Sequence, residues 1–304
     1  MILILSILSL LIGQSRVGEW EALTSVIDFR DIVCIDEVTF AATGGGILKI
    51  EDNVYSTYTT LDALEGVDLS SIAVDLNSNL WVGGNSPFGF VQIYDPRNRQ
   101  SISTFDFGLS EIIDIQFNDK TCWILYRDGQ EKGLMKFIYN DGWEYRDSYS
   151  NYPTISGDIN CFTVSDSLIY LGMANGLFSG KRTSNLKDPN SWTLEISSMI
   201  DDVTSMQLVN EQLYFTTNNK IFDYEISSKT ISEDEFTYSL EVVDNILITP
   251  VGKWIIDQNN LYLKTESNDY LITDEYLLSN FVYQSGQLLA GSNTGLIIIE
   301  NDNS

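Results

Sequence analysis

The sequence predicts an all-β protein: a seven-bladed β-propeller closed by an N-terminal outer strand that completes the last blade. Two observations carry this prediction. A unit of three short strands recurs seven times, and successive units follow at intervals of 35 to 44 residues. A small sheet of this size cannot bury both of its faces alone, so repeats of this length pack around a common axis as blades.

The unit is clearest in residues 72–95. Apolar residues alternate with smaller or polar ones at its start, which is the period-two pattern of a half-buried strand. The segment from Asp75 to Asn79 is a polar turn whose side chains can bond nearby backbone groups. A second strand begins at Leu80 and a third at Gly89, so the unit is an antiparallel triplet.

The residue that opens the third strand aligns across the repeats. The seven openers are Gly46, Gly89, Gly133, Gly176, Lys220, Asn260 and Gly295. A matching second strand precedes every opener, as Leu80-Trp81-Val82-Gly83 precedes Gly89. The recurrence is therefore structural and sets the number of blades at seven.

A fourth, outer strand follows several triplets and begins with a small residue and Trp. Gly142-Trp143 and Ser191-Trp192 carry this signature, and Gly18-Glu19-Trp20 resembles it but precedes the first triplet. The last triplet ends near Glu300. We therefore expect residues 20–24 to pair with residues 295–300 and close the ring, which leaves no long open edge.

The first residues predict export. Residues 1–12 are apolar but too short for a confident membrane span, and Gly13 and Ser15 offer small residues to a signal peptidase. We expect a signal peptide at 1–15 and one propeller domain at 16–304, in a periplasmic, cell-surface or extracellular protein. A buried strand or a retained anchor are the alternatives. No Cys follows the run to accept a lipid.

Composition restricts the partners. Seventeen basic and forty-three acidic residues give a net charge of −26, which opposes binding to nucleic acid and to anionic membranes. Cys34, Cys122 and Cys161 are expected to be small buried hydrophobic residues, with a Cys122–Cys161 disulfide as the alternative. The charge itself has two interpretations: a solubilising surface, or carboxylates gathered into a cation site.

Polar residues stand before the apolar start of each predicted inner strand. They are Asp31, Ser71, Glu111, Asp158, Asp202, Glu241 and Asn280. In a propeller these positions converge on one mouth of the central channel. The five carboxylates, Asp31, Glu111, Asp158, Asp202 and Glu241, are therefore candidate metal ligands, with Ca²⁺ or a basic group of a ligand as the cation. In the alternative, each side chain satisfies local backbone donors and points outward.

Two loops are candidate contact sites for a partner. Residues 85–88 and 127–132 are the longest insertions between second and third strands, and they share a face with the predicted acidic ring. Phe88, Arg127 and Asp128 are the partner-binding candidates. Packing of each loop on its own side chains is the alternative.

Catalysis has little support in the sequence. The chain contains no His, which removes the commonest general base and every His–metal site. We therefore predict no catalytic residues, no cofactor and no enzymatic activity. The alternative function is a carboxylate-dependent polysaccharide hydrolase or lyase, which would need a deep pocket holding two carboxylates with separated proton affinities.

The repeat, with an Asp/Asn turn and Leu80-Trp81-Val82-Gly83-Gly84, resembles the repeats of two-component regulator propellers. The opening blades, from Trp20 to Ile50, are similar to the amino-terminal propeller of PorZ-type proteins of the type IX secretion system. The resemblance implies a non-enzymatic extracytoplasmic binding or sensing module that recognises a protein, peptide or glycan through one face. Members of these families continue into further domains, so we expect either part of a longer protein or a free exported binder.

Overall fold

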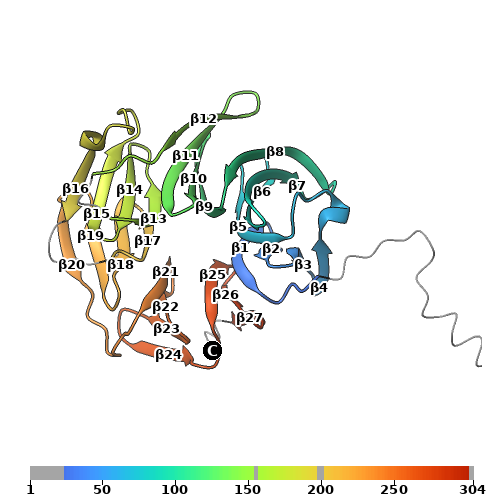
Figure 1. Ribbon diagram of the computed structural model, residues 1–304. Helices are drawn as coiled ribbons and strands as arrows, with labels where there is room; N and C mark the ends of the chain where they lie inside the picture. Colours follow the sequence, from blue (N-terminus) through green and yellow to red (C-terminus); the bar gives the residue numbers. More distant parts are fainter. Residues whose placement is uncertain (1–23, 154–156, 197–201, 301–304) are drawn as a thin grey trace, which may run out of the picture.

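The computed structural model describes residues 24–153, 157–196 and 202–300, and the structural statements below refer to these residues. Seven antiparallel sheets stand around a central axis (Figure 1). The strand order within every sheet follows the chain, so each sheet is a meander. The predicted all-β, seven-bladed propeller is therefore confirmed.

Blade 1 contains β1 (Phe29–Ile35), β2 (Val38–Thr43), β3 (Gly46–Glu51) and β4 (Val54–Tyr58). Blade 2 contains β5 (Asp68–Val74), β6 (Leu80–Ser86), β7 (Gly89–Asp95) and β8 (Gln100–Leu109). Blade 3 contains β9 (Glu111–Asn118), β10 (Thr121–Asp128), β11 (Glu131–Tyr139) and β12 (Trp143–Tyr149). Blade 4 contains β13 (Ile159–Val164), β14 (Leu168–Met173), β15 (Gly176–Lys181) and β16 (Trp192–Ile196).

Blade 5 contains β17 (Ser205–Val209), β18 (Gln212–Thr216), β19 (Ile221–Glu225) and β20 (Thr230–Glu233). Blade 6 contains β21 (Val243–Thr249), β22 (Gly252–Asp257), β23 (Asn260–Lys264) and β24 (Asp269–Thr273). Blade 7 contains β25 (Leu278–Gln284), β26 (Gln287–Ser292) and β27 (Gly295–Glu300). Two short 3₁₀ turns, η1 (Thr60–Asp62) and η2 (Pro189–Ser191), lie outside the sheets.

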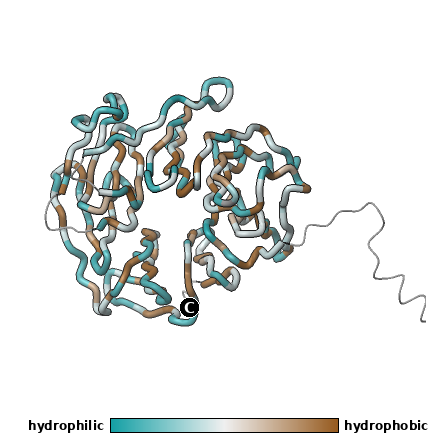
Figure 2. Tube along the Cα trace, viewed as in Figure 1, coloured by the Kyte–Doolittle hydropathy of each residue, from teal (hydrophilic) through white to brown (hydrophobic). Residues whose placement is uncertain are grey.

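The hydrophobic core lies between neighbouring blades, and apolar residues recur along the strands of every blade (Figure 2). Trp81 of blade 2, for example, packs edge-on against Trp143 and Phe137 of blade 3, with ring centroids 5.2 Å apart in both pairs. Large aromatic side chains at such seams each bury 150–250 Å² and contribute about 3 kcal/mol or more. The blades are therefore held together chiefly by apolar packing.

The predicted openers agree closely with the third strands. Five openers are the first residues of their strands; β11 begins two residues before Gly133, and β19 begins one residue after Lys220. Gly46 shows why glycine recurs here. Its φ is +118°, and a Cβ at this position would lie 2.2 Å from the Tyr58 carbonyl oxygen of the outer strand.

Two of the Trp-led outer strands are also confirmed, because β12 begins at Trp143 and β16 at Trp192. Trp20 and the predicted signal peptide, residues 1–15, lie outside the described residues. The expected pairing of residues 20–24 with 295–300 therefore stays a prediction. Within the described part of the chain, no helix is long and apolar enough to span a membrane.

The polar turn and the cysteines have simple local roles. Asp75 Oδ1 accepts hydrogen bonds from the backbone N–H groups of Asn77 and Asn79, at 2.8 and 2.9 Å, which closes the predicted hairpin turn. All three thiols are free, so Cys122 and Cys161 do not form a disulfide. Cys122 is fully buried, in the role expected of a small hydrophobic residue.

Candidate recognition face at the channel mouth

The first strand of every blade lines the central axis, and all seven of these inner strands start at the same end of the ring (Figure 1). Successive strands are antiparallel, so the turns between second and third strands lie at this end too. The connections between blades arrive there as well. We call this end the entry face.

A repeated hydrogen bond links neighbouring blades near the entry face. In six blades the pairing of the inner strand with the second strand shifts by one residue, which marks a β-bulge. In most blades the side chain at the bulge donates a hydrogen bond to a backbone carbonyl oxygen of the next blade. Thr204 is the donor in blade 5, which has no bulge. The accepting residue is the one directly before the equivalent position in the next blade. The donor–acceptor pairs are Arg30 to Leu69, Ser70 to Ile112, Asn160 to Val203, Thr204 to Val243 and Ser279 to Phe29.

Two blades depart from this pattern. In blade 3 the bulged residue is Ile113, which has no donor, and Lys132 Nζ donates to the Ile159 carbonyl oxygen instead, at 2.7 Å. In blade 6 the bulged residue is Asp244, a carboxylate. No side chain among the described residues replaces it as a donor to the Leu278 carbonyl oxygen, so this seam alone lacks the bond within the described chain.

These bonds establish which residues are equivalent at the channel mouth. In each blade, the residue directly before the one whose carbonyl oxygen accepts this bond carries the first side chain at the entry face. We call these seven positions the mouth ring. They are Asp28, Asp68, Glu111, Asp158, Asp202, Val242 and Leu277. Five consecutive blades thus present a carboxylate, and the last two present apolar side chains.

The structure places three of the five predicted carboxylates, Glu111, Asp158 and Asp202, in the mouth ring. It does not place Asp31 or Glu241 there. Asp31 lies three residues deeper on β1, and Glu241 lies one residue before the mouth position of blade 6.

Asp28 and Asp68 were missed, although the sequence contains a signal for them. Each inner strand carries two apolar residues three positions apart, as Phe29 and Ile32 do in blade 1. The strand start predicted from the sequence is the second of these apolar residues in three blades and an earlier residue in the other four. The bulge between them, which periodicity does not show, is the physical reason for the offset.

The carboxylates of the mouth ring differ in how they are neutralised. Arg30 contacts Asp28 at 3.0 Å and Asp68 at 2.6 Å, and Arg127 contacts Glu111 at 3.4 Å. Asp202 accepts a hydrogen bond from Asn160 at 3.0 Å.

Asp158 and Asp202 have no ion pair among the described residues. Throughout that same part of the chain, no group of three or more Asp, Glu, Cys or His side chains could hold a metal ion.

The candidate partner-binding residues lie beside this ring. Phe88 is 38% exposed at the end of the β6–β7 turn and packs edge-on against Phe90. A Cβ at the adjacent Gly89 would lie 2.7 Å from the Glu111 backbone nitrogen, so this turn abuts the start of blade 3. Arg127 pairs with Glu111, and Asp128 is exposed at the end of β10, directly before the β10–β11 turn. The two loops therefore flank one carboxylate of the mouth ring.

Below the mouth ring, polar side chains from four blades form a hydrogen-bonded row that ends on a backbone N–H group of a fifth blade. Ser205 donates to Asn245 at 2.9 Å, Asn245 donates to Asn280 at 3.0 Å, and Asn280 donates to Asp31 at 2.6 Å. Asp31 Oδ2 also accepts from the Ile72 backbone N–H at 2.8 Å. The row spans the seam between blades 7 and 1 and helps to hold the ring together there.

Asp31 has a perturbed pKa. It keeps some solvent contact within the channel but is surrounded by protein, and this burial raises the pKa of its carboxyl to about 7. The hydrogen bonds from Ile72, Ile32 and Asn280 oppose the rise, whereas the nearby Asp114 carboxylate adds to it. Burial also raises the pKa of Asp114. Asp31 therefore titrates within the physiological pH range.

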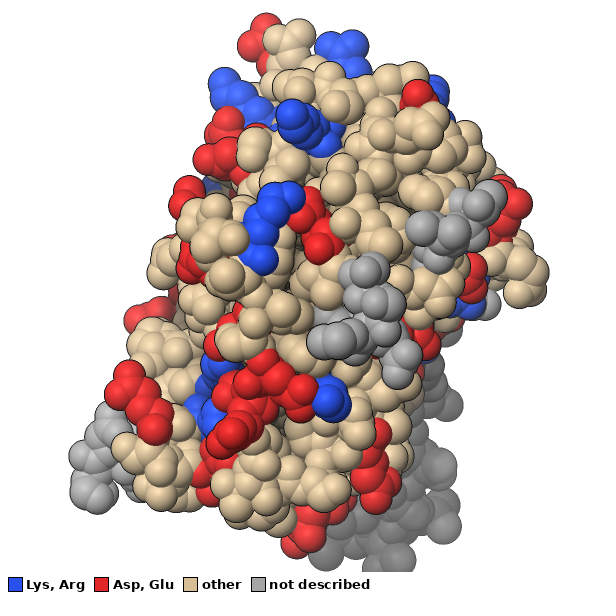
Figure 3. Space-filling view, turned by 90° about the vertical axis from the view of Figure 1, so that its left-hand side faces the viewer, with Lys and Arg blue, Asp and Glu red and all other residues tan. Residues whose placement is uncertain are grey.

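On the outer side of the ring at blades 4 and 5, acidic and basic side chains are mixed, whereas the mouth ring is rich in carboxylates (Figure 3). A groove of about 540 Å³ between these blades contains Glu195, which accepts from Ser179, Tyr224 and Lys229 at 2.6, 3.0 and 2.9 Å. Burial opposes ionisation of Glu195, but these bonds outweigh it and hold the pKa below its usual value. Among the described residues that line this groove, Glu195 is the only carboxylate.

Propellers of known structure are similar to this chain over most of its length. PorZ, a bacterial surface component of the type IX secretion system of Porphyromonas gingivalis, superposes with a TM-score of 0.71 and 17% identity, covering 92% of this chain and 38% of PorZ. The extracellular domain of a proposed one-component system from B. thetaiotaomicron gives a TM-score of 0.68 and 13% identity, covering 92% and 40%. The WD40 propeller of Doa1 gives a TM-score of 0.69 and 14% identity, and the match covers 92% of this chain and 95% of the Doa1 chain.

At these identities the likeness shows the fold alone. The expected resemblance to the PorZ and two-component propellers is confirmed at that level, and this chain spans about two fifths of the length of those two proteins. No family model and no curated protein matches the sequence.

Proposed function

We propose that this protein is a non-enzymatic, extracytoplasmic binding or sensing propeller that holds a basic segment of a partner protein against the entry face. The observation that carries the proposal is the mouth ring. Carboxylates on blades 1 to 5 stand beside apolar side chains on blades 6 and 7, around one opening. Complementary charge of this kind sets the orientation and speed of association.

Two carboxylates of the mouth ring are available to an incoming cation. Asp158 is exposed and Asp202 is half-buried, and neither forms an ion pair with a described residue. The neighbouring Lys132 is already engaged with the Ile159 carbonyl oxygen. A Lys or Arg side chain of a partner would therefore find its strongest attraction at blades 4 and 5.

The apolar part of the entry face favours a protein segment over a simple cation. Val242 and Leu277 are 39% and 54% exposed in the mouth ring, and Tyr276 is exposed next to Leu277. The buried Asp257 carboxylate accepts from the backbone N–H groups of Glu241 and Val242 and so fixes this connection. A partner with alternating basic and apolar side chains would contact both parts of the ring.

The location is supported by the initial apolar run and by the likeness to extracellular propellers. Residues 1–12 carry the pattern of a secretory signal. The proposal thus places the module outside the cytoplasm, where the surface it meets is another envelope or secreted protein.

The hydrolase alternative receives less support from the site. Asp31 has the raised pKa of a general acid, but both of its carboxylate oxygens accept hydrogen bonds from this chain's own donors. A group so engaged stabilises the ring, and it has no free oxygen directed at a substrate. We therefore assign Asp31 a structural role.

The experiment compares two charge reversals of equal size. The probe is a fluorescently labelled eight-residue peptide of alternating Lys and Leu, titrated into the full chain at low and at physiological salt. Asp158→Lys combined with Asp202→Lys changes the entry face. Glu37→Lys combined with Asp166→Lys changes exposed carboxylates at turns between first and second strands, on the opposite end of the ring.

The entry-face variant should bind the peptide about tenfold more weakly, or about 1.4 kcal/mol, whereas the opposite-end variant should bind almost as the native chain does. Equal weakening by both variants would mean that only net charge attracts the peptide, and the proposed site would be wrong.

A further inference from the structure

The seam between blades 6 and 7 departs from the bonding pattern of the other seams at the entry face. In five seams a side chain of the earlier blade donates to a carbonyl oxygen of the later blade, as Arg30 does to Leu69 at 3.1 Å. Between blades 6 and 7, the side chain at this position is Asp244, and the equivalent carbonyl oxygen belongs to Leu278. An ionised carboxylate and a carbonyl are both acceptors, so neither can satisfy the other.

The missing donor leaves a place for a ligand. Asp244 Oδ2 accepts from the Gln258 backbone N–H at 3.0 Å, and no described residue donates to the other carboxylate oxygen. We propose that a Lys or Arg side chain of the partner enters this seam and donates to both the Asp244 carboxylate and the Leu278 carbonyl oxygen. This inference rests on the proposed function, because it names one contact that a basic segment makes at the entry face.

The seam between blades 3 and 4 shows that a lysine can fill this place. The bulged residue there is Ile113, which has no donor, and Lys132 of the third strand places its Nζ 2.7 Å from the Ile159 carbonyl oxygen. The carbonyl is thus satisfied by a side chain from outside the inner strand. A basic side chain at Leu278 would make the same bond and a second, charge-assisted one to the carboxylate.

The local charge favours a cation. Gln258 donates to Asp244 through its backbone and to Glu241 through its side chain, and Asp257 accepts from the Glu241 backbone N–H at 3.1 Å. No Lys or Arg in the described part of the chain forms an ion pair with any of these three carboxylates. Burial raises the pKa of Asp244, and the nearby Asp257 charge adds to the rise. A bound cation would relieve this repulsion.

Apolar side chains flank the seam and suit the stem of a basic side chain. Val242 and Leu277, the mouth-ring residues of blades 6 and 7, are both exposed. Val242 lies two residues before Asp244, and Leu277 directly precedes Leu278. Lys and Arg side chains cover apolar surface with their methylene stems while the charged end stays with polar groups.

The repeat also shows what a purely structural residue would be at position 244. The bulged residues of blades 1, 2, 4 and 7, which all donate across their seams, are Arg30, Ser70, Asn160 and Ser279. A carboxylate in their place leaves a carbonyl without its donor in the free protein. Departures from a repeated local rule are expected where a function requires them.

The test gives the full chain the donor that it lacks. Asp244→Arg copies the residue of blade 1, and Asp244→Ser copies that of blades 2 and 7 and adds no positive charge. Both variants should melt about 2 °C higher than the native chain, because the Leu278 carbonyl oxygen gains a donor. The labelled Lys–Leu peptide should bind about tenfold more weakly to Asp244→Arg and about threefold more weakly to Asp244→Ser, because its own basic side chain has lost this place.

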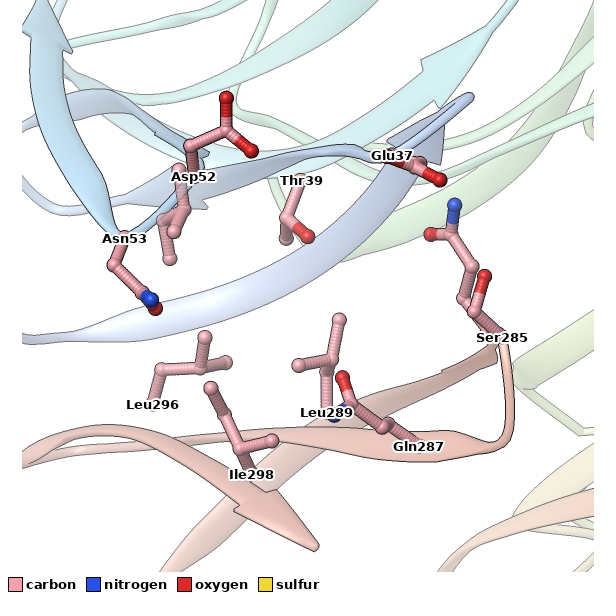
Figure 4. A pocket seen from close by; sticks show the side chains of 11 residues that line it. Glu37, Thr39, Asp52, Asn53, Ser285, Gln287, Leu289, Leu296 and Ile298 are labelled. Atoms are coloured by element: carbon pink, nitrogen blue, oxygen red, sulfur yellow. The ribbon is translucent and has the colours of Figure 1, made fainter. Parts of the chain in front are cut away.

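Glu37→Arg, at the opposite end of the ring, is the matched control. Glu37 also lies near apolar side chains, because it lines a groove of about 410 Å³ whose apolar side contains Leu289, Leu296 and Ile298 (Figure 4). The charge changes by the same amount as in Asp244→Arg. Peptide binding should stay within about twofold of the native value, because charges farther apart than about 8 Å are largely screened at physiological salt.

The outcomes separate this inference from the proposed function. If Asp244→Arg and Asp244→Ser bind the peptide as the native chain does, while Asp158→Lys combined with Asp202→Lys weakens binding, this inference is wrong and the proposed function stands. Native binding by all of these variants would contradict both. Equal weakening by Asp244→Arg and Glu37→Arg, or a lower melting temperature for both Asp244 variants, would also overturn the inference.

Discussion

The Asp31 carboxylate makes a pH-dependent contribution to stability that can be isolated by Asp31→Asn. The folded-state pKa is raised from 3.8 to about 7, so the folded protein retains a proton that the unfolded chain has lost. Stability from this group is therefore fully present below about pH 4 and is lost as the pH rises to about 7. At about 1.36 kcal/mol per pKa unit, the complete loss is about 4 kcal/mol.

The Asp31→Asn side chain has no carboxyl group to titrate. Its amide nitrogen would, however, face the Ile72 N–H, which then loses its acceptor. That second effect does not depend on pH, so the comparison uses the slope of stability against pH and not the absolute value. Between pH 5 and pH 8 the native chain should lose about 3 kcal/mol more than Asp31→Asn.

The assay is urea unfolding at pH 5, 6, 7 and 8, with linear extrapolation to water at each pH. Asp36→Asn, an exposed carboxylate in the following turn, is the matched control and should follow the native profile. Parallel profiles for the native chain and Asp31→Asn would refute the reasoning, because they would show that burial does not perturb this carboxyl.

Three further predictions follow from the same contacts. Asp114→Asn should lower the pKa of Asp31, because it removes the neighbouring negative charge, and should move the loss of stability to lower pH in the same urea series. Lys132→Met should cost about 1–3 kcal/mol in thermal or urea unfolding, because the Ile159 carbonyl oxygen loses its donor, and an equal stability would contradict that role. Asp257→Ala should cost about 1–3 kcal/mol because it leaves the Glu241 and Val242 N–H groups without their acceptor, with Asp274→Ala at an exposed site as the control.

The strand triplets were predictable because their signals are local. A glycine opens most third strands because a side chain at positions such as Gly46 would collide with the outer strand, and that requirement is visible in one repeat at a time. The Trp that opens β12 and β16 is equally local. These features set the blade number and the boundaries of most strands.

The composition of the mouth ring was only partly predictable. In six of the seven blades a bulge offsets the inner strand by one residue, and each blade begins with two apolar residues, either of which could be aligned as the strand start. The bonds that settle the alignment join residues about 40 positions apart, as Thr204 joins Val243. The substitution of Lys132 for the missing donor of Ile113 depends on a side chain from a different strand, which a repeat pattern does not reveal.

The location of the binding surface is the central claim, and carboxylate labelling tests it most directly. The native chain is treated with a carbodiimide and an amine, with and without the Lys–Leu peptide, and modification at each Asp and Glu is measured by mass spectrometry. The peptide should protect Asp158, Asp202 and Glu111 severalfold and leave Glu37 and Asp166 unchanged. Even protection over both ends of the ring, or protection of Glu37 and Asp166 alone, would contradict the assignment of the entry face.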